Sequence, residues 1–161
     1  MSDYYPGDGD RPHPGPLEVS VSGEIRDGIV DHARREVPNE ACGIIVGDRA
    51  AVDGGRALRW VPLRNQLASP YRYAIDPDDL LRLTIGTDDA DEVFWAIVHS
   101  HVASPARPSP TDVREAHYPE ALYLLVSLDA AEANAATGAE SVRAWRIVEG
   151  GVHEVELSVD G

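Results

Sequence analysis

Several residue types are scarce or missing in this sequence, and each absence excludes a class of protein. The 161 residues include one cysteine, Cys42, which excludes a disulfide framework and a zinc site built from several cysteines. There is no lysine, and fourteen arginines stand against twenty-eight acidic residues, which gives a formal net charge of −14. Such a surface repels phosphate groups. The charge therefore argues against general binding to nucleic acids or anionic membranes and favours a basic protein partner.

Long hydrophobic runs are also missing. The longest, such as Ala121–Val126, fall short of the roughly 18 residues that would suggest a membrane span. The first sixteen residues lack the basic and then apolar stretches of a secretory signal, so we expect a cytoplasmic protein. The hydrophobic content of 43% is nevertheless ordinary for one globular domain, while an eight-fold β/α barrel would need a longer chain.

The chain divides into a short arm and one domain. Residues 1–16 contain four prolines and three glycines without a periodic apolar pattern, which predicts a disordered arm, and the domain is expected over residues 17–161. Strands are expected over 17–21, 43–47, 57–62, 71–75, 93–98 and 121–128, with a hairpin over 142–159 that turns at Gly150-Gly151. Helices are expected after Ser22, Asp76 and Ser109. This order predicts a single α/β domain in which helices flank a mixed sheet.

A pair of histidines ends one of the expected strands. His99 and His101 follow a hydrophobic stretch, and because side chains along a strand alternate, both rings point to the same side. A proline-containing loop then leads to Asp112, in the first turn of the next helix, from where its carboxylate can fold back. Two imidazoles and one carboxylate suit zinc and leave a fourth position open, as catalytic sites do. A His-x-His pair also occurs by chance, and Ser109 with Asp112 also fits a helix capping box.

A hydrolytic zinc site needs a proton acceptor as well. Zinc lowers the pKa of a bound water to about 7, and a nearby carboxylate then acts as general base and later as general acid. Glu40 is the candidate, because it stands where a helix ends and a buried strand begins; a solvated loop acid is the alternative. Ser109 can donate a hydrogen bond to a developing oxyanion. We interpret Cys42 as a small buried side chain rather than a nucleophile.

In combination, these residues resemble a known motif. Glu40, the His99-Ser100-His101 pair and Ser109-x-x-Asp112 match the JAMM (MPN-plus) metalloproteases at every spacing. The resemblance implies that Glu40 is the acid/base, that the two histidines and Asp112 bind one zinc ion, and that Ser109 stabilises the oxyanion. It also implies the family's fold, a mixed sheet flanked by helices and related to cytidine deaminases. The deaminase chemistry itself is excluded, because there is no Pro-Cys-x-x-Cys to supply thiolate ligands.

The chain also resembles a bacterial branch of this family, the sulfur-carrier-protein cysteine hydrolases. Segments 39–43, 123–127 and 146–151 are similar to that branch, which also tolerates a residue such as Val102 where the usual motif has proline. The branch implies cleavage of the amide after the C-terminal Gly-Gly of a ubiquitin-like sulfur carrier, with release of cysteine, and is compatible with a homodimer. Two alternatives stay open: a general isopeptidase that removes ubiquitin-like modifiers from lysines, and a non-catalytic MPN scaffold.

Overall fold

The helices and strands follow the predicted order with one exception. The computed structural model describes residues 18–130 and 141–160, so the arm expected over residues 1–16 lies outside the described residues. The elements are β1 (Glu18–Ser22), α1 (Gly23–Glu36), β2 (Cys42–Gly47), the 3-10 turn η1 (Ala51–Asp53), β3 (Ala57–Leu63), α2 (Pro77–Asp89), β4 (Val93–His101), α3 (Pro110–Arg114), β5 (Leu122–Ser127), β6 (Ser141–Val148) and β7 (Gly151–Asp160).

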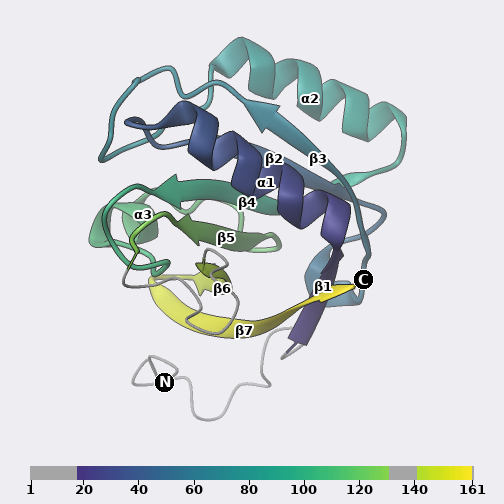
Figure 1. Cartoon of the computed structure of the whole chain (residues 1–161). Coiled ribbons are helices and arrows are strands. Elements are labelled where there is room, and N and C mark those ends of the chain that lie inside the picture. The colour runs from purple at the N-terminus through teal and green to yellow at the C-terminus, as the bar shows by residue number, and fades with distance from the viewer. Residues whose placement is uncertain (1–17, 131–140, 161) are drawn as a thin grey trace.

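The seven strands of the described residues form one curled sheet in the order β1-β7-β6-β5-β4-β2-β3 (Figure 1). The pairs β4–β5 and β1–β7 are parallel, whereas all other neighbours in the sheet are antiparallel. The predicted fold class, one α/β domain built on a mixed sheet, is therefore confirmed. Strand β4 lies inside the sheet, between β5 and β2, which protects its backbone from solvent.

The sheet carries a hydrophobic core on each face. On one face α1 packs with residues such as Ile29 against Val98 of β4. On the other face Leu83 of α2 packs into a cluster that includes Ile97. In Figure 1 α1 crosses in front of β2 and β4, and α2 lies beyond β3. Because side chains along a strand alternate, His101 points to the same face as Ile97, which is the face that α2 and α3 cover.

The helices begin and end at the residues that the sequence indicates. The Ser22 hydroxyl accepts the backbone N–H of Ile25 at 3.1 Å and caps α1, which ends at Glu36 because the residue before Pro38 avoids the α conformation. The Asp76 carboxylate caps α2 by accepting two backbone N–H groups of its first turn. None of the helices within the described ranges combines the length and the apolarity needed to cross a bilayer.

The strand expected over residues 71–75 is wrong. This stretch contributes only an isolated bridge between Asn65 and Ile75. The reason lies in the Asn65 side chain, whose amide donates to the carbonyl of Arg72 at 2.9 Å and whose oxygen accepts the N–H of Ala74 at 3.1 Å. Backbone groups engaged by a side chain in this way cannot pair with a neighbouring strand. Residues 64–76, the β3–α2 segment, therefore form a loop that follows β3, one of the two edge strands of the sheet.

The C-terminal hairpin turns one residue earlier than expected. Val148 of β6 pairs with Gly151 of β7, so the two turn residues are Glu149 and Gly150. Both have positive φ, 51° and 80°, as a two-residue turn requires when it matches the twist of its strands. The glycine pair was correctly interpreted as a turn signal, but only its first member belongs to the turn.

Candidate active site

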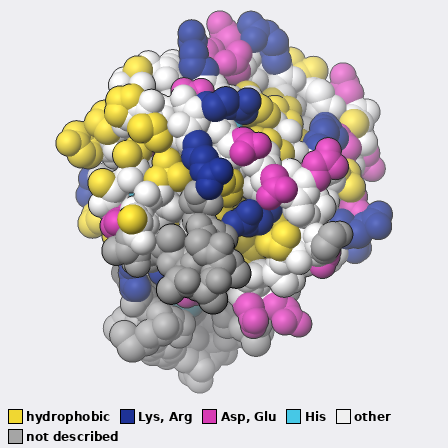
Figure 2. All heavy atoms as spheres, viewed as in Figure 1, with side chains coloured by type: hydrophobic (Ala, Val, Ile, Leu, Met, Phe, Trp, Pro, Cys, Tyr) yellow, Lys and Arg dark blue, Asp and Glu magenta, His cyan; other side chains and the backbone are white. Residues whose placement is uncertain are grey.

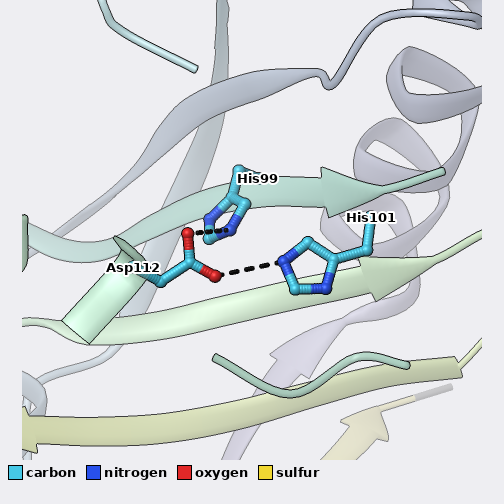
Figure 3. Close-up of side chains that lie close together, drawn as sticks. All are labelled: His99, His101 and Asp112. Atoms are coloured by element: carbon cyan, nitrogen blue, oxygen red, sulfur yellow. Dashed lines mark hydrogen bonds and ion pairs between the residues drawn. The ribbon is translucent and has the colours of Figure 1, made fainter. Parts of the chain in front are cut away.

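Strand β4 brings His99 and His101 to the same place. Their ring centroids are 5.1 Å apart, and the two residues are only 2% and 5% exposed. His99 lies opposite Cys42 of β2 and Leu125 of β5 in the sheet, so its backbone is held on both sides. The rings therefore stand at the end of a rigid strand, and they point toward Asp112 (Figure 3).

Asp112 reaches both rings from α3. Its Oδ1 lies 3.2 Å from Nε2 of His99, and its Oδ2 lies 3.1 Å from Nε2 of His101. The same carboxylate accepts the backbone N–H of Ser109 at 2.8 Å, while the Ser109 hydroxyl accepts the N–H of Asp112 at 3.1 Å. The capping box is thus present, and its carboxylate also faces the histidines. The capping box and a role of Asp112 as a metal ligand are therefore compatible, because the cap orients the carboxylate toward the rings.

The hydrogen bond on the far side of His101 determines what its ring offers to Asp112. Nδ1 lies 2.7 Å from the carbonyl of Pro105, so Nδ1 carries a proton and donates it. In the neutral ring Nε2 then has a lone pair, which faces a carboxylate oxygen. Two such acceptors lie together stably only with a cation between them or a second proton on the ring. Burial alone would lower the pKa of His101, but the bonds to Asp112 and Pro105 raise it.

The pKa values of the other two members of the cluster, Asp112 and His99, are both lowered. Burial alone would raise the pKa of the Asp112 carboxyl, but the adjacent rings of His101 and His99 hold it well below its usual range. Burial lowers the pKa of the His99 ring, which favours its neutral form. Asp112 is therefore ionised and His99 is neutral, which are the protonation states that metal ligands need.

The geometry of the cluster fits a metal ion. His99, His101 and Asp112 each offer one ligand atom, and these atoms lie within 4.8 Å of one another. The Nε2 atom of the buried His99 faces Oδ1 of Asp112 at 3.2 Å, and its Nδ1 has no hydrogen-bond partner among the described residues, so no group outside the cluster competes for this ring. Two imidazole nitrogens and a carboxylate oxygen are a donor set that zinc accepts, and a fourth position would stay open for water or substrate.

Glu40 stands beside the cluster, in the connection between α1 and β2. The N–H of Ala41 donates to the Ser100 hydroxyl at 2.8 Å, and the N–H of Ser100 donates to the Ala41 carbonyl at 3.0 Å, which places Glu40 next to the end of β4. Its side chain is buried, and Oε1 has no hydrogen-bond partner among the described residues. Burial raises the pKa of Glu40 to about 7, with His101 lowering it and Asp112 raising it further. A carboxyl group with this pKa can both accept and donate a proton near neutrality.

The comparisons with known proteins agree with this geometry. Residues 23–148 match the family described as prokaryotic homologs of the JAB domain. The chain belongs to this family. The matched range starts at α1 and ends with β6, so it includes every strand around the candidate site of the JAB domain and all five predicted site residues.

Relatives of this JAB-domain chain include named enzymes. It is 37% identical to the CysO-cysteine peptidase of Mycobacterium tuberculosis over 139 residues, which cover 86% of this chain and 89% of the peptidase. It is 31% identical to a desampylase of Haloferax volcanii over 116 residues, which cover 69% and 81% of the two chains. A solution structure from Desulfitobacterium hafniense aligns with a TM-score of 0.73 at 31% identity, over 88% of this chain and 92% of that one. The chain is a JAB-type hydrolase.

Cys42 lies in the interior of the JAB domain and does not take part in the candidate site. It is 1% exposed, and burial raises the pKa of its thiol to about 12, with smaller contributions from Glu36 and Glu40. A thiol with such a pKa does not form the nucleophilic thiolate at neutral pH. The interpretation of Cys42 as a packing residue is in agreement with these surroundings.

Some residues of the JAB domain that contact the site, such as Tyr73 and Asn65, were not identified from the sequence. The ring of Tyr73 stacks on that of His99, with centroids 4.4 Å apart and planes inclined by 22°. Asn65 donates to the carbonyl of Glu40 at 3.0 Å. Both belong to the β3–α2 segment, and Tyr73 lies in the stretch 71–75 that was interpreted as a strand. A short motif search offers no signal for them, because they reach the site through long-range contacts.

Proposed function

We propose that this chain is a zinc-dependent hydrolase that cleaves the amide bond after the C-terminal Gly-Gly of a small ubiquitin-like sulfur-carrier protein and releases cysteine. The observation that carries the proposal is the convergence of His99, His101 and Asp112 beside the buried carboxyl group of Glu40. The identity of 37% with a CysO-cysteine peptidase, over most of both chains, supports this choice of substrate. The proposal also places the enzyme in the cytoplasm.

His99, His101 and Asp112 are the proposed ligands of one zinc ion. The carbonyl of Pro105 keeps the proton of His101 on Nδ1, which leaves Nε2 to bind the metal. The N–H of Ser109 holds one oxygen of Asp112 and so orients that carboxylate. Zinc, when bound there, supplies Lewis acidity that polarises a carbonyl and acidifies a water molecule.

Glu40 and Ser109 are the proposed catalytic residues. Glu40 takes a proton from the attacking water on its carboxylate and later delivers this proton to the leaving amine, and its pKa of about 7 suits both steps. The Ser109 hydroxyl accepts a hydrogen bond from the N–H of Asp112, so its own hydrogen is available to donate to the oxyanion of the tetrahedral intermediate. Burial of the site keeps these interactions strong.

The β3–α2 segment and strand β3 are the proposed docking place for the carrier's tail. An extended peptide can add to an outer strand through backbone hydrogen bonds, and glycines let its backbone approach closely. Leu67 and Tyr71 in this segment are exposed apolar side chains. Figure 2 shows hydrophobic side chains gathered at the left edge of the molecule, where the connections at this end of the sheet lie in Figure 1. The net charge of −14 favours a carrier with a basic surface and disfavours nucleic acid.

The proposal is tested with two conjugates of one carrier. The first carries cysteine in amide linkage after Gly-Gly, and the second carries a lysine side chain at the same position. Zinc-loaded enzyme should release cysteine from the first conjugate, detected by mass spectrometry, and the variant Glu40→Gln should bind zinc but show no release. If the zinc-loaded wild-type chain cleaves neither conjugate, the proposed activity is refuted.

A second candidate is a general isopeptidase that removes ubiquitin-like modifiers from lysines. The 31% identity with a desampylase favours it. In this case the lysine conjugate is cleaved at least as fast as the cysteine conjugate. The same residues would carry both reactions, because the two substrates differ only on the leaving side of the cleaved bond.

A further inference from the structure

The side chain of Asn65 makes four hydrogen bonds, all of them to backbone groups. Its amide nitrogen donates to the carbonyls of Glu40 at 3.0 Å and Arg72 at 2.9 Å. Its oxygen accepts the N–H groups of Leu67 and Ala74, each at 3.1 Å. Three of these partners belong to the β3–α2 segment itself and define its shape. The fourth, Glu40, lies 25 positions earlier in the chain and belongs to the candidate site.

Both backbone polar groups of Glu40 are bound by this segment. The carbonyl accepts the amide of Asn65, and the N–H donates to the carbonyl of Ser69 at 2.8 Å. Glu40 precedes β2, which begins at Cys42, so the register of the sheet does not hold its backbone. The β3–α2 segment therefore holds the main chain of Glu40 in place.

The carboxyl group of Glu40 has little else to fix it. Its Oε1 is buried and has no hydrogen-bond partner among the described residues. The position of the carboxyl group therefore depends mainly on where the backbone of Glu40 is held. A displacement of about 1 Å in a reacting group can lower a rate by about 100-fold.

We propose that Asn65 is a positioning residue for the hydrolysis: its amide, through the carbonyl of Glu40, sets where the carboxylate of the general base stands. This inference rests on the proposed function, because it assigns Asn65 a role through Glu40. The same residue also closes the loop that would receive the carrier's tail. One side chain thus joins the tail-binding segment to the acid/base residue, and a tail bound on the segment meets Glu40 in a defined position.

The test uses the full zinc-loaded chain, the cysteine conjugate described above and two variants of Asn65. Asn65→Asp has the same shape and keeps both accepted hydrogen bonds, but it loses the donors to Glu40 and Arg72. Asn65→Ala loses all four bonds. The matched control is Ser22→Ala, which removes the side-chain acceptor that caps α1, outside the β3–α2 segment and away from Glu40. Zinc content and thermal unfolding are recorded for every variant.

We expect kcat of Asn65→Asp to fall at least about tenfold, with KM changed less than about threefold and zinc content unchanged. The kcat of Asn65→Ala should fall at least as far, and Ser22→Ala should keep kcat within about twofold. An Asn65→Asp enzyme with wild-type kcat, including one in which only KM rises, overturns the inference. So does an equal loss of kcat in Ser22→Ala, because the effect would then be a general loss of stability. A wild-type chain inactive on both conjugates refutes instead the proposed function on which the inference rests.

Discussion

Replacing Glu40 by Gln should remove the hydrolytic activity and at the same time stabilise the metal-free protein at alkaline pH. Burial raises the pKa of this carboxyl from its usual 4.5 to about 7 in the folded chain. The folded state therefore favours the neutral form, so the contribution of Glu40 to stability is fully present below pH 4.5 and is lost as the pH rises through 7. At about 1.4 kcal/mol per pKa unit, the wild-type chain loses about 3 kcal/mol by pH 8.

The amide of Gln stays neutral at every pH and avoids this loss. Chelator-treated Glu40→Gln should be more stable than the wild type by about 3 kcal/mol at pH 8, equivalent to a rise of about 6–12 °C in Tm, and by less than about 1 kcal/mol at pH 5. Urea unfolding followed by tryptophan fluorescence measures the difference, since Trp95 and Trp145 are buried. The control is Glu156→Gln, which neutralises an exposed carboxylate on β7. An equal stability difference between wild type and Glu40→Gln at both pH values refutes the reasoning.

Three further predictions concern the surroundings of the site. Asp112→Asn should weaken zinc binding at least about 100-fold in a chelator competition assay. The zinc affinity of the wild type should decrease as the pH is lowered, because protons then compete with zinc for His101, whose pKa Asp112 raises despite burial. Cys42→Ala should keep its hydrolytic rate within about twofold. Because the wild-type thiol has a pKa of about 12 in the folded chain, a disulfide reagent at pH 8 should label it only after unfolding. Tyr73→Leu should weaken zinc binding by removing the ring that stacks on His99, whereas Tyr73→Phe should not; equal affinities of the two variants would contradict a role for the stack.

Local rules account for much of the fold. The caps at Ser22 and Asp76 and the end of α1 before Pro38 depend on residues within a few positions of one another, and all three are present as predicted. The alternating side chains of residues 71–75 predict a strand, but the Asn65 side chain binds the backbone of this stretch and keeps it out of the sheet. Asn65 also binds Glu40, which lies 25 positions away. Such a partner leaves no periodic signal in the sequence.

The candidate site divides in the same way. That His99 and His101 share one face follows from the two-residue repeat of any strand, and the cap formed by Ser109 and Asp112 follows from four consecutive positions. Whether Asp112 also reaches the rings depends on how the loop before α3 folds back over the end of β4, which no local pattern specifies.

The sequence by itself determined which groups the site contains and which of them lie on a common strand or helix turn. Only the tertiary structure decided how these elements meet: β2 beside β4, α3 over the histidines and the β3–α2 segment against Glu40. The protonation behaviour of the groups depends on that assembly. A carboxyl group has an ordinary pKa in an unfolded chain, and the pKa of Glu40 differs mainly because distant segments bury its side chain.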